Sequence, residues 1–136
     1  MRDALVEAAR SLAEEGLSPG ASGNLSARQG DGMWITPTGI ASARLEVADL
    51  VRVGLDGERL EGSRDPSSEW RMHAAVYRAS EGAAAVVHCH SPYATILACA
   101  RRGIPPLHYM LAVADSYVLA DDVTFERLRS RNVLMP

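Results

Sequence analysis

The sequence predicts an α/β domain in which helices pack on a mixed, largely antiparallel sheet. Strand-like and helix-like segments mix along the chain without strict strand–helix alternation. Two hairpin signals fall in the first half, at residues 29–32 (Gln-Gly-Asp-Gly) and at Asp56-Gly57. The 136 residues, 47% hydrophobic and 23% charged, suffice for one core, and the composition shows no break. We therefore predict one domain over residues 1–136.

The first half of the chain is expected to hold one helix and four short strands. Apolar residues recur at helical spacing over residues 3–15, and Gly16 is expected to end that helix. A loop rich in turn-forming residues follows at 18–24. The strands are expected at residues 25–28, 33–36, 50–53 and 58–60.

The second half is expected to be richer in helix. A helix should run to about Ser80, with Ser67 or Ser68 as its N-cap. Its predicted buried side consists of Met72, Ala75, Val76 and Ala79. The apolar run at 83–90 predicts a buried strand. A helix that starts at Ser91-Pro92 should reach about residue 102 and stop at Gly103.

Composition excludes several classes of protein. The net charge of −3, the pI near 5.8 and the lack of a basic patch argue against nucleic-acid binding. No stretch approaches the roughly 20 apolar residues of a membrane span, and the acidic N-terminus does not resemble a signal peptide. Cys89 and Cys99 are expected to be reduced thiols in a core. These features predict a cytoplasmic protein.

His88-Cys89-His90 is the sharpest chemical feature. On a strand, residues i and i+2 point to the same face, so both imidazoles should aim at one point while Cys89 faces away. Imidazole nitrogens suit zinc or a similar divalent ion, although a His-x-His pair alone also occurs as ordinary polar or core histidines. Both residues end an apolar strand just before a helix, where ligand crevices form in open α/β sheets. The position favours a metal site.

Ser67, Ser68 and Glu69 stand at a predicted helix start. The simplest interpretation is that a serine caps the helix and Glu69 complements its dipole. Two hydroxyls at a helix N-terminus also suit an anion, and a carboxylate there can contact a metal or act as a general base. The sequence alone leaves both interpretations open.

Two loops offer backbone groups for a phosphate. Glycines in residues 20–24 and 36–39 let the main chain approach a ligand, although both loops could also be simple turns. The first loop lacks the lysine of a P-loop, which argues against nucleotide binding. His73 is expected to be a hydrogen-bonded structural histidine that shares a helix face with Glu69. Tyr109, after His108, could act as an acid or merely pack.

Taken in order, these motifs resemble the class II aldolase/adducin family over about residues 3–114. The matching segments are Gly20-x-x-Gly23-Asn24-Leu25-Ser26, Ile35-Thr36-Pro37-Thr38-Gly39-Ile40, Pro66-Ser67-Ser68-Glu69-Trp70-Arg71-x-His73, Val86-Val87-His88-x-His90 and Ile104-Pro105-Pro106-x-His108-Tyr109-Met110. The resemblance implies a three-layer α/β/α fold, a zinc or other divalent ion, and a homotetramer with active sites between subunits.

The resemblance also implies roles for particular residues. His88 and His90 would bind the metal, and Glu69 would be the catalytic acid/base that can also contact it. Tyr109 would lie near the site. The substrate phosphate would be held by Gly23, Asn24, Thr38, Gly39, Ser67 and Ser68. The implied reaction cleaves a ketose 1-phosphate, such as L-fuculose 1-phosphate, to dihydroxyacetone phosphate and an aldehyde.

After Ala114 the sequence is expected to depart from the family. The family carries a third metal histidine on a later strand, whereas no histidine follows His108 here. We therefore expect the C-terminal part of the fold to be missing, and the third ligand to come from His108, from another subunit or from Glu69. The alternatives to an active aldolase are an inactive shortened chain, an adducin-like oligomerisation domain, or a sugar-phosphate epimerase or dehydratase.

Overall fold

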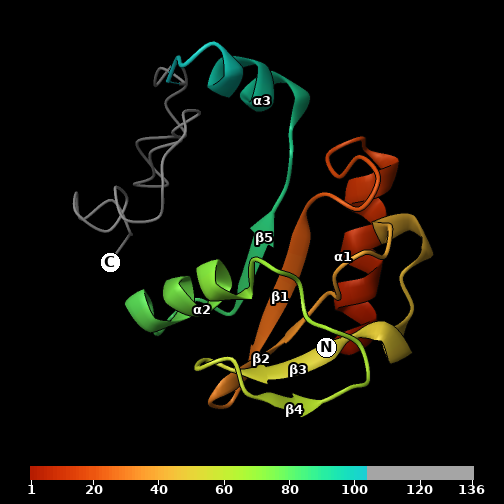
Figure 1. Cartoon of the computed structure of the whole chain (residues 1–136), viewed down its shortest axis with the longest axis vertical. Helices are drawn as coiled ribbons and strands as arrows, with labels where there is room; N and C mark the ends of the chain where they lie inside the picture. The colour runs from red at the N-terminus through yellow and green to blue at the C-terminus, as the bar shows by residue number, and fades with distance from the viewer. Residues whose placement is uncertain (104–136) are drawn as a thin grey trace. The chain divides into compact units, whose positions relative to one another are not determined.

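The computed structural model describes residues 1–103. These residues belong to two units, Met1–His90 and a second that begins at Ser91. The first unit contains helices α1 (Arg2–Glu14) and α2 (Trp70–Ala79), two short 3₁₀ turns (Ser42–Arg44 and Val47–Asp49) and five strands (Figure 1). The strands are β1 (Asn24–Gln29), β2 (Gly32–Ile35), β3 (Val51–Gly54), β4 (Arg59–Glu61) and β5 (Ala85–His88). The second unit contributes α3 (Pro92–Cys99). Within residues 1–103, every helix is too short or too polar to cross a bilayer.

The five strands form one sheet in the order β4-β3-β2-β1-β5, and all four pairings are antiparallel. The two predicted hairpins connect β1 to β2 and β3 to β4, so both signals are confirmed. β5 pairs with β1 from far along the chain, with His88 opposite Asn24. This pairing carries the two histidines to the end of the sheet where β1 begins.

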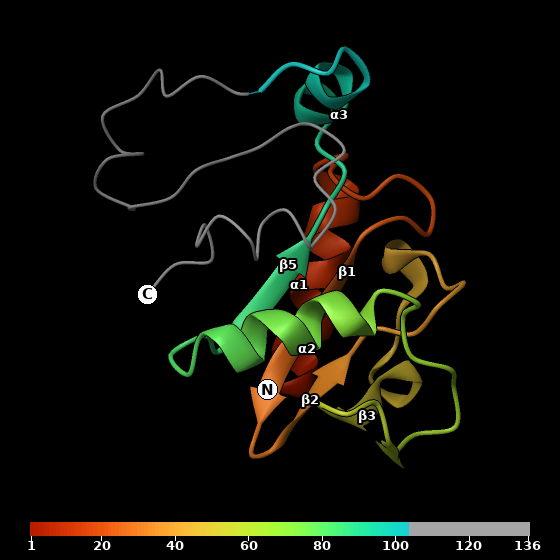
Figure 2. The ribbon, with the colours of Figure 1, turned by 60° about the vertical axis from the view of Figure 1, so that its left-hand side comes forward.

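Alternation along β2 divides the first unit into three layers. Trp34 packs into one cluster with Leu5, Val6 and Ala9 of α1, whereas Met33 and Ile35 pack into a second cluster with Ala74 and Tyr77 of α2. Successive residues of a strand point to opposite faces, so α1 and α2 cover opposite faces of the sheet (Figure 2). The expected α/β/α layering is therefore confirmed.

The predicted buried side of α2 is wrong. The buried residues are His73, Ala74 and Tyr77, whereas the four predicted ones are half-buried or exposed. Polar side chains can occupy a buried face when each hydrogen-bonding group has a partner, and the apolar spacing gave no sign of this. The predicted cap also differs: Glu69 takes the N-cap position without a side-chain cap, and its N–H donates to Ser67 Oγ over 3.3 Å.

The segment predicted as a buried strand is an edge strand of the described sheet. Ala85 and Val87 are exposed, and Val86 and His88 are half-buried. The strand has a sheet neighbour on one side only, β1, and Val86 packs toward α2. One-sided pairing leaves much of its apolar surface uncovered.

Both cysteines are free, as expected, but neither lies in a core: Cys89 and Cys99 are exposed. Cys89 directly follows the edge strand β5, and Cys99 is the last residue of α3. That helix is shorter than predicted: it ends at Cys99 with Ala100 as its C-cap, and the chain turns with a positive φ of 53° at Arg101. Pro92 occupies its first turn as predicted.

The turn at Asp56-Gly57 leads to a testable prediction. Gly57 has a φ of 96°, and a Cβ at this position would overlap the indole ring of Trp70. Gly57→Ala is therefore expected to destabilise the protein by about 1–3 kcal/mol through strain and overpacking. The matched control is Gly82→Ala, where φ is ordinary and no atom lies within 4 Å. Chemical denaturation should separate the two variants, and equal stabilities would contradict the prediction.

Candidate active site

Two of the segments predicted to hold a phosphate, the 36–39 loop and the serine pair at 67–68, lie on neighbouring stretches of chain. Pro37 and Pro66 form an antiparallel bridge, flanked by bonds from Thr38 N to Asp65 O (3.1 Å) and from Ser67 N to Thr36 O (3.0 Å). The structure therefore joins the 36–39 loop to the segment that leads into α2.

A further bond ties these loops to the sheet. Leu25 N donates to Thr36 Oγ1 over 3.2 Å. Gly23 lies next to the end of β5, because a Cβ there would come within 2.9 Å of His88 O. Only glycine fits this position, where φ is also positive at 76°. The glycine loop and the histidine strand therefore meet at one edge of the sheet.

The predicted phosphate residues differ in what they can offer a ligand. Thr38, Gly39 and Ser68 are exposed. The Thr38 N–H already has Asp65 O as its acceptor, so only its hydroxyl is free to serve a ligand. Ser67 is buried, and its hydroxyl accepts from Glu69 N.

Glu69 lies between the start of β1 and the end of β5. Its Oε2 accepts a hydrogen bond from Asn24 Nδ2 (2.5 Å) and lies 3.4 Å from His88 Nε2. The Glu69 side chain is 42% exposed and that of His88 is 26% exposed. A small molecule can therefore reach both groups.

His88 and His90 share a face, as the i and i+2 spacing predicted. Their Nε2 atoms lie 3.1 Å apart and their rings meet edge to face. The N–H of His90 donates to Leu17 O over 2.8 Å, which fixes the backbone just after β5. Two nitrogens bound to one tetrahedral zinc at about 2.0–2.1 Å lie roughly 3.3 Å apart. The observed spacing is close to that value, so the pair fits a shared metal ion.

Two histidine nitrogens and one carboxylate oxygen do not yet make a complete site. Among residues 1–103, no set of three or more histidine, cysteine or acidic side chains is arranged to hold a metal ion. A catalytic zinc usually has three protein ligands. His108 and Tyr109, the remaining residues predicted to lie near the site, fall outside the described residues.

Behind Glu69, a row of hydrogen bonds enters the protein core. Asn24 Oδ1 lies 2.5 Å from His73 Nε2, and His73 Nδ1 lies 2.7 Å from Ser26 Oγ. Ser26 Oγ in turn lies 2.8 Å from Tyr77 Oη. His73 is thus a hydrogen-bonded structural histidine, as predicted. Ser26 and Tyr77 were missed, although Asn24 and Ser26 stand two apart on β1 and so face the same helix.

Burial shifts the pKa values of His73 and Tyr77, the two titratable side chains in this row of hydrogen bonds. It lowers the pKa of His73 from 6.5 to about 4, an effect to which nearby His88 adds and which Glu69 opposes. Burial likewise raises the pKa of Tyr77, against the hydrogen bond with Ser26 and the charge of Arg28. Both side chains are therefore neutral at pH 7.

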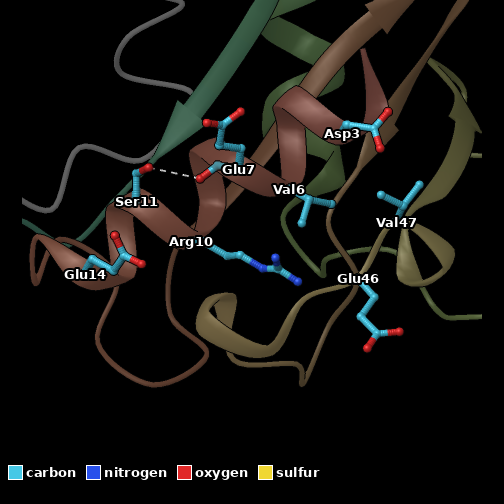
Figure 3. A pocket seen from close by; sticks show the side chains of 8 residues that line it. All are labelled: Asp3, Val6, Glu7, Arg10, Ser11, Glu14, Glu46 and Val47. Carbon is cyan, nitrogen blue, oxygen red and sulfur yellow. Dashed lines mark hydrogen bonds between the residues drawn. The ribbon is translucent and has the colours of Figure 1, made fainter.

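A cavity of about 640 Å³ lies elsewhere, between α1 and the 3₁₀ turn Val47–Asp49 (Figure 3). None of the predicted site residues lines it. Arg10 donates two bonds to Leu45 O, over 3.1 and 2.7 Å, and is the only cation of the lining. The lining carboxylates are Asp3, Glu7, Glu14 and Glu46. Four acidic groups against one engaged guanidinium make this cavity a poor seat for a phosphate.

The chain belongs to the family of the class II aldolase and adducin N-terminal domain, whose sequence model matches residues 3–133. The match continues past Ala114, where the motifs had predicted a departure from the family.

Two proteins with similar sequences show which reactions occur among the relatives of this chain. The chain is 46% identical over 114 residues to a 5-methylthioribulose-1-phosphate/5-deoxyribulose-1-phosphate aldolase of Rhodospirillum rubrum, covering 84% of this chain and 51% of that protein. It is 50% identical over 96 residues to a probable bifunctional methylthioribose-1-phosphate isomerase/methylthioribulose-1-phosphate dehydratase of Nocardia farcinica, covering 69% of this chain and 17% of that one.

A solved structure of an L-fuculose 1-phosphate aldolase matches the fold with a TM-score of 0.77 at 39% identity. The match covers 82% of this chain and 54% of the other. The chain thus spans about half the length of the aldolases it matches.

Proposed function

We propose that this protein is a metal-dependent aldolase that cleaves a ketose 1-phosphate to dihydroxyacetone phosphate and an aldehyde. The observation that carries the proposal is the cluster of Glu69, His88 and His90, with a carboxylate oxygen 3.4 Å from one imidazole and the two imidazoles 3.1 Å apart. Membership of the family and the names of the two similar aldolases support the reaction type.

In this proposal His88 and His90 hold a zinc or other divalent ion, with Glu69 close enough to contact it. The chemistry of the donors suits such an ion, since neutral imidazole and carboxylate are common zinc ligands. When bound, the ion would supply Lewis-acid stabilisation of the negative charge that develops as the carbon–carbon bond breaks. A further ligand would come from outside residues 1–103.

Glu69 is proposed to carry the proton. During cleavage the C4 hydroxyl gives its proton to the Glu69 carboxylate, the electrons of the C3–C4 bond pass to C3, and C4 becomes the aldehyde carbon. Returning a proton to C3 completes dihydroxyacetone phosphate, and Glu69 is the carboxyl group placed to deliver it. Tyr109 is proposed as a second group near the site.

The phosphate is proposed to lie against the joined loops. Gly23 and Gly39 would let the main chain approach it, while Thr38 and Ser68 would offer exposed hydroxyls. Asn24 Nδ2 uses one of its two hydrogens for Glu69, which leaves the other for a phosphate oxygen. Ser67 is buried and would stabilise the conformation of the loop through its hydrogen bond from Glu69 N. Such anchoring would hold the reacting carbons in register with Glu69.

The substrate can be tested directly. Protein supplied with zinc is incubated with 5-methylthioribulose 1-phosphate or L-fuculose 1-phosphate, and dihydroxyacetone phosphate is measured by coupled reduction. We expect release from at least one of them. Consumption of substrate without dihydroxyacetone phosphate would instead indicate dehydration, which keeps the carbon skeleton whole and which the Nocardia farcinica relative's name favours as second candidate. No consumption of either substrate would contradict both.

Metal binding gives a separate prediction. The double variant His88→Gln, His90→Gln is expected to lose the ion that the wild-type chain holds, because both imidazole ligands disappear together. The matched control is Cys89→Ser, which changes the residue between them. Elemental analysis after dialysis should give about one ion per chain for wild type and control. Equal metal content in the double variant would contradict the assignment.

The wider proposal places the protein in the cytoplasm as a homotetramer with active sites between subunits. The competing possibility, an adducin-like oligomerisation domain, predicts a stable oligomer that neither binds metal nor cleaves sugar phosphates. Sedimentation analysis together with the metal and cleavage assays separates the two. An oligomer with metal and cleavage supports the aldolase, and an oligomer without either supports the oligomerisation domain.

A further inference from the structure

The hydrogen-bonded row behind Glu69 runs in one direction. Glu69 Oε2 is an acceptor, so the group of Asn24 that faces it must be the amide NH₂. The Asn24 carbonyl oxygen then faces His73 Nε2, which must carry a hydrogen to bond to it. With the ring neutral, Nδ1 is an acceptor and receives the hydroxyl hydrogen of Ser26. Tyr77 in turn donates to Ser26.

The opposite orientation of the Asn24 amide is unfavourable where it faces Glu69. If the Asn24 amide were flipped, its carbonyl oxygen would face the Glu69 carboxylate and its NH₂ would face the imidazole. Two acceptors would then oppose each other at 2.5 Å, which is electrostatically repulsive. His73 is fully buried, with 0% exposure, so no water competes for its nitrogens. The Nε2–H tautomer of His73 is therefore the one that supports Asn24 with its NH₂ toward Glu69, whereas the Nδ1–H tautomer would favour the flipped amide.

We infer that His73, held as its neutral Nε2–H tautomer by Ser26 and Tyr77, is a positioning residue that orients the Asn24 amide toward Glu69. The inference rests on the proposed function for its catalytic consequence, but not for its geometry. Asn24 is the shared element, since its amide contacts Glu69 and is also proposed to serve the substrate phosphate. His73 itself touches neither the substrate nor the reacting atoms.

The first test reads the tautomer without any activity. A long-range proton–nitrogen correlation spectrum of labelled protein at pH 7 distinguishes the Nε2–H ring, the Nδ1–H ring and the doubly protonated ring. The His73 signals are assigned by their loss in His73→Gln. We expect the neutral Nε2–H tautomer. The Nδ1–H tautomer or an imidazolium would overturn the inference, whether or not the protein cleaves a sugar phosphate.

The second test uses a matched pair of variants. His73→Gln can present an amide N–H near the place of Nε2, whereas His73→Leu offers no donor. In His73→Leu the Asn24 NH₂ resonances should move and kcat should fall roughly 10- to 100-fold, with substantial rescue in His73→Gln. A merely structural role would lower stability in both variants without this ordering in kcat per folded protein. Unmoved Asn24 signals in folded His73→Leu, or an unchanged kcat, would overturn the inference.

The two tests separate this inference from the proposed function. If the wild-type protein cleaves no ketose phosphate, the proposed function fails, while the tautomer and the Asn24 resonances still decide the positioning role. If cleavage occurs and His73 has the wrong tautomer, the inference fails alone.

Discussion

Replacing Glu69 by glutamine is expected to lower kcat for cleavage of the ketose 1-phosphate by about 10²–10⁴-fold. Glutamine has nearly the same shape, and its amide oxygen can still accept the bond from Asn24 Nδ2. It cannot, however, gain and release a proton at neutral pH. The loss should therefore appear in kcat, with a smaller change in KM, because an interaction needed in the transition state is removed.

The control for this experiment is Glu81→Gln, an exposed acid just after α2, which should leave kcat unchanged. Metal content should be measured in parallel. Metal retained with activity lost assigns Glu69 to proton transfer, whereas metal lost along with activity assigns it to the metal. A Glu69→Gln protein with kcat within a few-fold of wild type would rule out either role.

The second large effect concerns stability and pH. In the folded protein the pKa of His73 is about 4, mainly because burial disfavours the charged ring, against 6.5 in the unfolded chain. As the pH falls below about 6.5, the unfolded chain binds a proton at His73 that the folded protein does not bind. The free energy of unfolding contributed by this site is therefore fully present above the unfolded pKa, falls as the pH drops toward 4, and stays lowered below that.

Each unit of pKa difference corresponds to about 1.4 kcal/mol, so the full loss amounts to about 3 kcal/mol, of which about 2 kcal/mol falls between pH 7 and pH 5. Urea denaturation at these two pH values, with a chelator present, measures it. His73→Gln is the matched control because glutamine does not titrate. We expect its free energy of unfolding to fall by about 2 kcal/mol less than that of wild type. Equal losses in the two proteins would contradict the prediction.

Local signals predicted most of the secondary structure. Helical spacing and Gly16 located α1, and the turns at 29–32 and 56–57 located both hairpins. The spacing of His88 and His90 predicted a shared face, because alternation along a strand is a property of the backbone. These features depend on residues a few positions apart, so the sequence shows them directly.

Two predictions of burial were wrong because they assumed that apolar side chains are the ones that become buried. The α2 face was predicted from Met72 and its apolar neighbours, whereas the helix buries His73 and Tyr77. The segment 83–90 was predicted as buried because it is apolar, whereas β5 lies at the edge of the described sheet. In both cases burial depends on which partner covers a surface, and hydrophobic spacing does not identify that partner.

The sequence by itself determined the family, the order of the elements and the residue types of the candidate site: two histidines, one glutamate and two glycine-containing loops. Only the tertiary structure decided that Asn24 and His73 lie behind Glu69, in a row that ends at Tyr77. The bonds of this row join residues 45 to 51 positions apart. Such contacts arise when α2 packs on β1, and no local periodicity encodes them, since each polar group finds its partner only after the layers have assembled.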